Sequence, residues 1–369
     1  MEKRIVFGAI TMVAVATGMF GQSATPFKLG TFEQNGRAFV GIVVKDSIVV
    51  DFAQAHAAFK SASKVAPPAD MKDLIARYDT GVRARINEIL ETLQNTKAPA
   101  GGGRLSFVSD LKSVKTLPPI TYPTTMLNVA VNYRAHAAEM AAGAPQAGGP
   151  APGDALPGTA SAPGIWERKP DDKRWNPYMF MKSPSIVIAD GEAIRLPIGR
   201  TNIDWECELG VVLGRTADHV PIERAAEYIF GYTLENDVSD RGGRGDTRHG
   251  SDWVISKNHD TFAPMGPFIV PKEFVPNPQN LQVKFTLNGQ VMQDANTSLM
   301  IHSVFEIVSY ASNILTLRPG DVLATGSPAG VGSARKPPIF LKAGDMSVCS
   351  YDGIGTLTNP IVAPRAPSR

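Results

Sequence analysis

The N-terminal part of the chain alternates short apolar runs with turn-forming residues, a pattern typical of a β-meander followed by helices. Turns at 34–36 and 45–47 separate predicted strands at 28–32, 38–44 and 48–52. Helical spacing of apolar residues follows at 53–59, 71–78 and 82–93, before a Gly/Ala-rich linker at 98–103. The pattern predicts a small N-terminal α+β domain over residues 25–104. This domain offers no candidate catalytic or metal-binding residues.

A second, strand-rich pattern begins near residue 125. It predicts strands at 126–131, 185–189, 208–213, 268–271, 282–287, 290–294 and 346–358. Helical patterns are limited to 133–140 and 301–315. Many short strands with few helices indicate an α+β, mostly β fold, with a second domain over residues 121–363.

Residues 141–177 interrupt this pattern with an Ala-, Gly- and Pro-rich segment that contains Trp166 and Trp175. A long irregular segment in a compact protein is commonly a functional lid or disordered. Because it directly follows His136, we predict a lid that carries a tryptophan towards the substrate. The alternative is an insertion whose tryptophans pack on the surface.

The composition is that of an ordinary soluble protein, with 369 residues, of which 43% are hydrophobic and 20% charged. The net charge is +2, and no basic run is interleaved with aromatic residues. A nucleic-acid partner is therefore not expected.

The N-terminus has the pattern of a secretory signal peptide. Lys3 and Arg4 precede an apolar run at 5–20, and small residues follow up to Ala24. We predict a signal peptide over 1–24 and an exported protein, periplasmic or secreted, with no stable membrane span after signal removal. An uncleaved anchor is the alternative.

The chain has two cysteines, Cys207 and Cys349, and both fall in predicted strands. We expect them to be small buried hydrophobic residues, since free cysteine is among the most buried residue types. A disulfide is permitted by an exported compartment but is not required.

Three carboxylates carry the strongest chemical signal. If 203–213 is a strand, Glu206 and Glu208 share one face while Cys207 points to the other. Their surroundings are apolar, so they repel each other unless a cation lies between them. With Asp237, which follows another apolar run, they offer hard oxygen ligands suited to Mg²⁺, Mn²⁺ or Ca²⁺. The alternative is a solvated strand edge with alternating polar residues.

His136 and Glu139 are three residues apart, which on a helix places them on one face. A carboxylate that orients an imidazole beside a metal provides a base for water or for a substrate carbon. The alternative is a surface hydrogen bond.

Six motifs occur along residues 121–362 in this order: Asn132-Tyr133-x-x-His136-x-x-Glu139, Lys182-Ser183-Pro184, Glu206-x-Glu208-Leu209-Gly210-Val211-Val212, Gly231-Tyr232-Thr233-x-x-Asn236-Asp237-Val238-Ser239, Lys257-x-x-Asp260-Thr261-Phe262-x-Pro264-x-Gly266-Pro267 and Thr325-Gly326-Ser327-Pro328-x-Gly330-Val331-Gly332. Together they resemble the fumarylacetoacetate hydrolase family. The resemblance implies a mixed β-roll or barrel as the catalytic domain, a supporting N-terminal domain and a homodimer.

The resemblance also implies roles for individual residues. His136 and Glu139 match the general base and its helper, and Lys257 matches a donor to the carbonyl or developing carbanion. The expected substrate-binding residues are Tyr133, Arg241, Arg244, Thr325 and Gly326. The chain departs from the family where Gly242-Gly243-Arg244 replaces an Asp and a nearby Gln, and the charge of Arg244 favours a more anionic substrate.

We therefore predict an enzyme that binds a small anionic oxo acid. It is expected to be a metal-dependent hydrolase that cleaves a C–C bond in a 2-oxo or 1,3-diketo acid through a metal-bound enolate. Two alternatives stay open: a lyase, decarboxylase, isomerase or hydratase using the same site, or a protein that binds metal and dicarboxylate without turnover.

Overall fold

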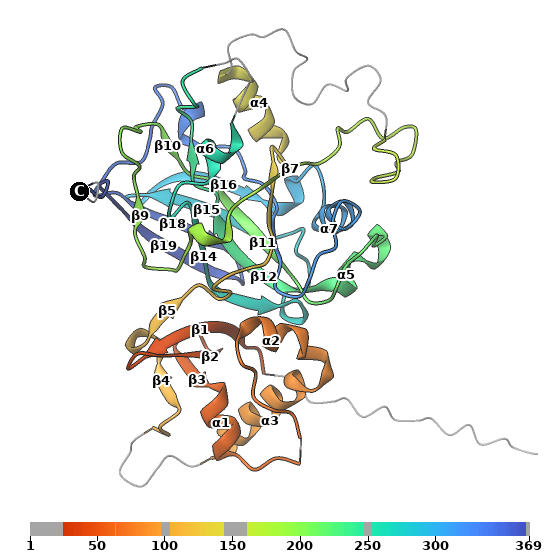
Figure 1. Ribbon diagram of the computed structural model, residues 1–369, viewed down its shortest axis with the longest axis vertical. Helices are drawn as coiled ribbons and strands as arrows, with labels where there is room; N and C mark the ends of the chain where they lie inside the picture. Colours follow the sequence, from red (N-terminus) through yellow and green to blue (C-terminus); the bar gives the residue numbers. More distant parts are fainter. Residues whose placement is uncertain (1–24, 63, 97–103, 144–160, 247–251, 367–369) are drawn as a thin grey trace, which may run out of the picture.

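The computed structural model describes residues 25–62, 64–96, 104–143, 161–246 and 252–366. The proposed signal peptide at 1–24 lies outside these residues. Figure 1 shows a small N-terminal part below a larger part that is rich in strands. The predicted α+β, mostly β class is confirmed.

The N-terminal part contains the predicted meander and helices. Its strands are β1 (Lys28–Gln34), β2 (Arg37–Val44), β3 (Ile48–Asp51), β4 (Val108–Asp110) and β5 (Lys115–Leu117). Its helices are α1 (Phe52–Ala58), α2 (Met71–Ala76) and α3 (Val82–Asn95). Asn35 and Gly36 have φ of 53° and 75°, as a two-residue hairpin turn requires. Asp51 and Asp70 cap α1 and α2 by accepting backbone N–H groups.

The larger part is built on two sheets, and β1 joins the N-terminal meander to the first of them through β14. The first sheet contributes β6 (Met126–Ala130), β7 (Tyr178–Met181), β8 (Val187–Ile188), β11 (Cys207–Leu213), β12 (Ile229–Asn236), β14 (Ala263–Pro271) and β17 (Val322–Ala324). The second sheet contains β9 (Ile194–Arg195), β15 (Gln282–Leu287), β16 (Gln290–Asn296), β18 (Met346–Tyr351) and β19 (Gly355–Val362). The short strands β10 (Ile203–Asp204) and β13 (Ser239–Asp240) pair with each other.

Helices are few in this part, as the pattern predicted. They are α4 (Arg134–Gly143), α5 (Ala225–Tyr228), α6 (Trp253–Lys257) and α7 (Val304–Ser312). A capping box between Ser303 and Glu306 begins α7. The main core extends through both parts of the molecule, and in the larger part Trp205 stacks on Phe285 of the second sheet with ring centroids 5.4 Å apart. Every residue of β11 and β12 is buried, so both strands lie in the interior.

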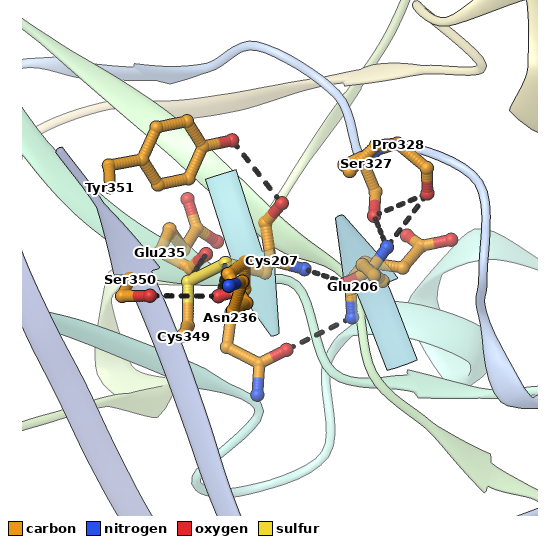
Figure 2. Close-up of a disulfide and its surroundings, with 11 residues drawn as sticks. Glu206, Cys207, Glu235, Asn236, Ser327, Pro328, Cys349, Ser350 and Tyr351 are labelled. Carbon is orange, nitrogen blue, oxygen red and sulfur yellow. Dashed lines mark hydrogen bonds between the residues drawn. A yellow bond between two sulfur atoms is a disulfide. The ribbon is translucent and has the colours of Figure 1, made fainter. Parts of the chain in front are cut away.

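The two cysteines form a disulfide that joins β11 to β18 (Figure 2). Their predicted burial is confirmed, and they form the disulfide that the sequence left open as the less favoured alternative. They are 142 residues apart in the sequence. Only the packing of the second sheet against the first brings them together, and no local pattern reveals that contact.

The described end of the predicted lid packs against α7. Trp166 is buried, with its ring edge-on to His302 at 5.1 Å and to Tyr310 at 6.0 Å. Arg174 donates to Glu306 at 2.7 Å and so ties the segment to the first turn of α7. Residues 144–160 of the segment lie outside the described residues. Its function as a lid stays a prediction.

The burial of His302 gives this packing a measurable pH dependence. Burial, reinforced by Arg174, lowers the pKa of His302 from 6.5 to about 4. Between these values the unfolded chain binds a proton that the folded protein does not. The stability is therefore complete above pH 6.5 and is lost as the pH falls towards 4, by about 3 kcal/mol. Urea unfolding across this range should show the loss. His302→Phe, which keeps a ring against Trp166 but cannot titrate, should flatten it. Parallel losses in the variant and the wild type would assign the effect to other groups.

Candidate functional site

Two neighbouring strands place four carboxylates on one face. In the antiparallel register of β11 and β12, Glu208 lies opposite Glu235, and the Asp237 N–H donates to the Glu206 carbonyl at 2.8 Å. Oxygens of Glu206, Glu208 and Asp237 all lie within 4.8 Å of one another, and all three side chains are buried. Glu206 and Glu208 therefore converge as strand alternation predicts.

Cationic side chains from three other segments approach this face. Lys257 of α6 donates to Glu206 at 2.7 Å and also to Asp237. Arg241 donates to the second oxygen of Glu206 at 2.6 Å, and Lys182, which follows β7, donates to Asp237. Burial raises the pKa of Glu206, but Lys257 and Arg241 outweigh it and hold the pKa well below its usual value. These contacts keep Glu206 ionised in the interior.

Glu208 has a different environment. Its Oε2 accepts the Gly326 N–H at 2.7 Å, and no lysine or arginine among the described residues forms an ion pair with it. Burial, followed by the charges of Asp237 and Glu206, raises the pKa of Glu208 well above its usual range. A divalent cation between the carboxylates would relieve this repulsion.

The residues present therefore fit a divalent cation. The group consists of carboxylate oxygens, which Mg²⁺, Mn²⁺ and Ca²⁺ prefer, and thiol ligands are absent from it. Glu208 lies on β11, Glu206 immediately precedes that strand and Asp237 immediately follows β12, and all three side chains are buried. The predicted metal-binding residues thus converge in space, and the choice among the three cations stays open.

The predicted acid-base pair lies beside this group. His136 Nδ1 is 2.7 Å from Glu139 Oε1, and His136 Nε2 is 3.6 Å from Glu206 Oε1. The Gly330 N–H donates to both oxygens of Glu139, at 3.1 and 2.9 Å. Burial lowers the pKa of His136, but Glu139 and Glu206 outweigh it and the pKa is raised. One ring nitrogen is thus held by Glu139 while the other faces the carboxylates.

The backbone before this pair is strained. Val131 has φ of 58°, a left-handed conformation that is rare for a β-branched residue. Asn132 then fixes the chain, because its side chain accepts the His302 N–H at 2.8 Å and donates to the Thr325 carbonyl at 2.8 Å. Gly326 packs against it so closely that a Cβ would lie 2.6 Å from the Asn132 Cβ. These contacts fix the backbone immediately before α4.

Comparison with known proteins supports the assignment that this geometry suggests. The family model described as fumarylacetoacetate (FAA) hydrolase C-terminal matches residues 125–362. The chain belongs to the fumarylacetoacetate hydrolase family. Oxaloacetate tautomerase fahd2 of Xenopus laevis, a mitochondrial protein by name, is 32% identical over 289 residues, which is 77% of this chain and 81% of the relative.

Two solved structures of this family are similar over nearly their whole length. The 5-carboxymethyl-2-hydroxymuconate delta-isomerase of Mycobacterium smegmatis is 30% identical, with a TM-score of 0.60 over 92% of this chain and 100% of that one. The fumarylacetoacetate hydrolase of Exiguobacterium antarcticum is 26% identical, with a TM-score of 0.65 over 91% and 99%. The relatives therefore include a tautomerase and an isomerase as well as a hydrolase.

The expectation of an exported, periplasmic or secreted protein is contradicted by these relatives, since the frog protein is named as mitochondrial. That expectation rested on the composition of residues 1–24 alone, outside the described structure. Among the residues that the structure describes, none of the helices has the length and apolar character needed to span a bilayer.

The predicted substrate-binding residues differ in how they are placed. Arg241 pairs with Glu206 and Asp204, and the Gly326 N–H is used by Glu208, so both contact the carboxylate group directly. Thr325 and Tyr133 are buried beside them, with Thr325 adjoining Gly326 and Tyr133 adjoining Asn132. Arg244 has 19% of its side chain exposed and forms an ion pair with Asp246. Their roles towards substrate stay predictions.

The departure from the family sequence after Arg241 has a structural counterpart. Asp240, immediately before that arginine, is buried and accepts the Gly242 N–H at 2.8 Å. It also pairs with Arg200 and lies 3.1 Å from His259 Nε2. The carboxylate of Asp240 therefore fixes the loop around Arg241.

Sequence reasoning missed several groups around the site. Lys182 belongs to one of the six motifs, but the sequence does not reveal its hydrogen bond to Asp237, because that bond depends on the packing of β7. Asp204 accepts the Gly332 and Ser333 N–H groups at 2.6 and 3.0 Å and pairs with Arg241, a role that no local pattern reveals. Glu235 could have been found, because it lies two residues before Asp237 in a strand and therefore on the same face.

Glu235 is a fourth buried acid with an unusual environment. Burial raises its pKa to about 7, and Lys182 only partly offsets this. One oxygen accepts the Asn128 amide at 3.1 Å, and the other has no hydrogen-bond partner among the described residues.

Gly330 should be intolerant of a side chain, because its N–H holds Glu139 while its backbone is left-handed and closely packed. Its φ is 107°, and an added Cβ would lie 2.1 Å from the Met292 carbonyl. Gly330→Ala should therefore displace the N–H that holds Glu139 and lower both stability and kcat. Gly353→Ala is the matched control, because Gly353 has φ of 75° and open space around it. The control should lose about 1 kcal/mol of unfolding free energy and keep its activity. Equal effects of the two substitutions, measured by urea unfolding and turnover, would contradict the role of Gly330.

Proposed function

We propose that this protein is a divalent-cation-dependent enzyme that interconverts the keto and enol forms of a small 2-oxo dicarboxylic acid of the oxaloacetate type. The observation that carries the proposal is the placement of His136, whose Nδ1 is held by Glu139 while Nε2 faces Glu206 at 3.6 Å. A base in this position can take a proton from a carbon next to a carbonyl group that lies at the carboxylates.

The cation and the protein residues have separate tasks in this proposal. When held by Glu206, Glu208 and Asp237, a divalent cation supplies Lewis-acid polarisation of the substrate carbonyl. His136 Nε2 accepts the proton from the adjacent carbon, and the Glu139 carboxylate stabilises the imidazolium that results. The same nitrogen then gives the proton to the former carbonyl oxygen, so that a C–H bond is exchanged for an O–H bond in the enol and nothing is oxidised or reduced.

Lys257 supports this proton transfer by its position. Its ammonium group lies between Glu206 and Asp237 and donates to Ser239 Oγ at 2.8 Å. The rings of Phe180 and Trp253 cover it at 4.9 and 6.0 Å. A buried positive donor stabilises negative charge on a substrate oxygen more strongly than an exposed one. The names of the frog and mycobacterial relatives, a tautomerase and an isomerase, agree with a proton-transfer reaction.

The second candidate is the C–C hydrolysis predicted from the sequence. The same His136 nitrogen could deprotonate water for attack on a carbonyl carbon, and one relative is named a fumarylacetoacetate hydrolase. The products separate the candidates, since tautomerisation leaves the carbon skeleton intact. Hydrolysis of an acylpyruvate gives two acids, and decarboxylation releases CO₂.

His136→Ala should remove turnover without removing the cation site. We expect kcat on oxaloacetate with Mg²⁺, followed by enol absorbance, to fall by roughly 10²- to 10⁴-fold because the base is lost. His219→Ala, at an exposed histidine, is the control and should keep its activity. Mg²⁺ binding by His136→Ala should persist in calorimetry. Unchanged turnover in this variant would remove the proposed base.

Removal of the cation should abolish turnover reversibly. Protein dialysed against a chelator is expected to lose tautomerisation, and added Mg²⁺ or Mn²⁺ should restore it. Because a ligand that binds only the folded state stabilises it, saturation at about 100 times Kd should add roughly 2.7 kcal/mol of unfolding free energy. Full activity in metal-free protein would exclude a cation-dependent reaction.

A further inference from the structure

The disulfide lies at the residue between two of the proposed ligands. Cys207 separates Glu206 from Glu208 on β11 and points to the opposite face, where it is bonded to Cys349 of β18 (Figure 2). These strands belong to different sheets. The covalent bond therefore ties the ligand-bearing strand to the second sheet at the residue that sets the spacing of the two glutamates.

The backbone of Cys207 is held by the second sheet as well. Tyr351, two residues after Cys349 and on the same face of β18, donates its hydroxyl to the Cys207 carbonyl at 3.4 Å. The Cys207 N–H donates to Gln293 Oε1 of β16 at 3.2 Å. Gln293 in turn donates to Ser327 Oγ at 2.8 Å, in the loop whose Gly326 contacts Glu208. Residues of the second sheet thus hold both the N–H and the carbonyl group of Cys207.

We propose that the Cys207–Cys349 disulfide is a positioning element for the cation site, so that cation affinity depends on whether this bond is intact. This inference rests on the cation site of the proposed function. Three buried carboxylates repel one another and would spread if β11 could move away from β18. The disulfide and Tyr351 oppose that movement from the face opposite the ligands.

The covalent step is a thiol–disulfide exchange. A thiol reductant such as glutathione donates two electrons and two protons in total, the Cys207–Cys349 bond becomes two thiols, and the reductant forms its own disulfide. The cysteine residues are only 0% and 1% exposed, so reduction requires an opening of the strands. The disulfide is therefore inaccessible to the reductant while the two strands stay packed.

Coupling between two equilibria is reciprocal. If the oxidised protein binds the cation more tightly than the reduced protein, a bound cation must make the disulfide harder to reduce by the same factor. As long as the reduced protein stays folded, which circular dichroism can check, a bond that only contributed to overall stability would not link the two equilibria in this way.

The first test is a calorimetric titration of the full protein with Mg²⁺. Oxidised wild-type protein, in which a thiol assay detects no free cysteine, is compared with reduced wild type and with the double variant Cys207→Ala/Cys349→Ala. We expect Kd to rise by roughly tenfold in both altered forms, as when a group supporting a metal ligand is lost. Ser347→Ala is the control, because its buried hydroxyl binds the Asn359 carbonyl on β19 and not β11. It should keep the wild-type Kd.

The second test uses only wild-type protein and therefore remains decisive if the double variant fails to fold. Wild-type protein is equilibrated in glutathione redox buffers with and without Mg²⁺, a hard cation that thiols bind poorly. Saturating Mg²⁺ should shift the thiol–disulfide equilibrium towards the disulfide by roughly the same tenfold factor. An equal Kd in oxidised and reduced protein, or an unshifted equilibrium, would overturn the inference. A wild type that takes up no Mg²⁺ would instead refute the proposed function.

Discussion

The structure depends on the placement of several carboxylates on one buried face of two adjacent strands. Like charges so close in the interior are unfavourable unless opposite charge or hydrogen bonds compensate them. Lys182, Lys257 and Arg241 supply this compensation for Glu206 and Asp237, and they come from segments far apart in the sequence. Among the described residues, Glu208 forms no ion pair and accepts the Gly326 N–H, so a bound divalent cation would offset its charge.

One loop connects the carboxylates to the acid-base pair. Gly326 contacts Glu208, Gly330 contacts Glu139, and Asp204 fixes the backbone of Gly332 beyond them. Because α4 and β11 share this support, a displacement of the loop would move the base and the ligands together. The close approach of Gly326 to Asn132 shows why the loop needs glycine where it passes the start of α4.

Local periodicity predicted much of the fold and the centre of the site. Alternation along β11 placed Glu206 and Glu208 on one face, and the three-residue spacing brought His136 and Glu139 together. The contacts that complete the site are not local. The bond of Lys182 to Asp237 and the disulfide to Cys349 arise only when strands from distant segments pack, and no spacing in the sequence encodes those distances. Composition alone also misled the prediction of export.

The most direct test of the account is anomalous diffraction from crystals of the wild-type protein soaked in Mn²⁺. One strong anomalous peak is expected within bonding distance of the oxygens of Glu206, Glu208 and Asp237, with the Lys257 ammonium beside it. A peak elsewhere, or none at these side chains in a crystal with full access to the ion, would contradict the central claim.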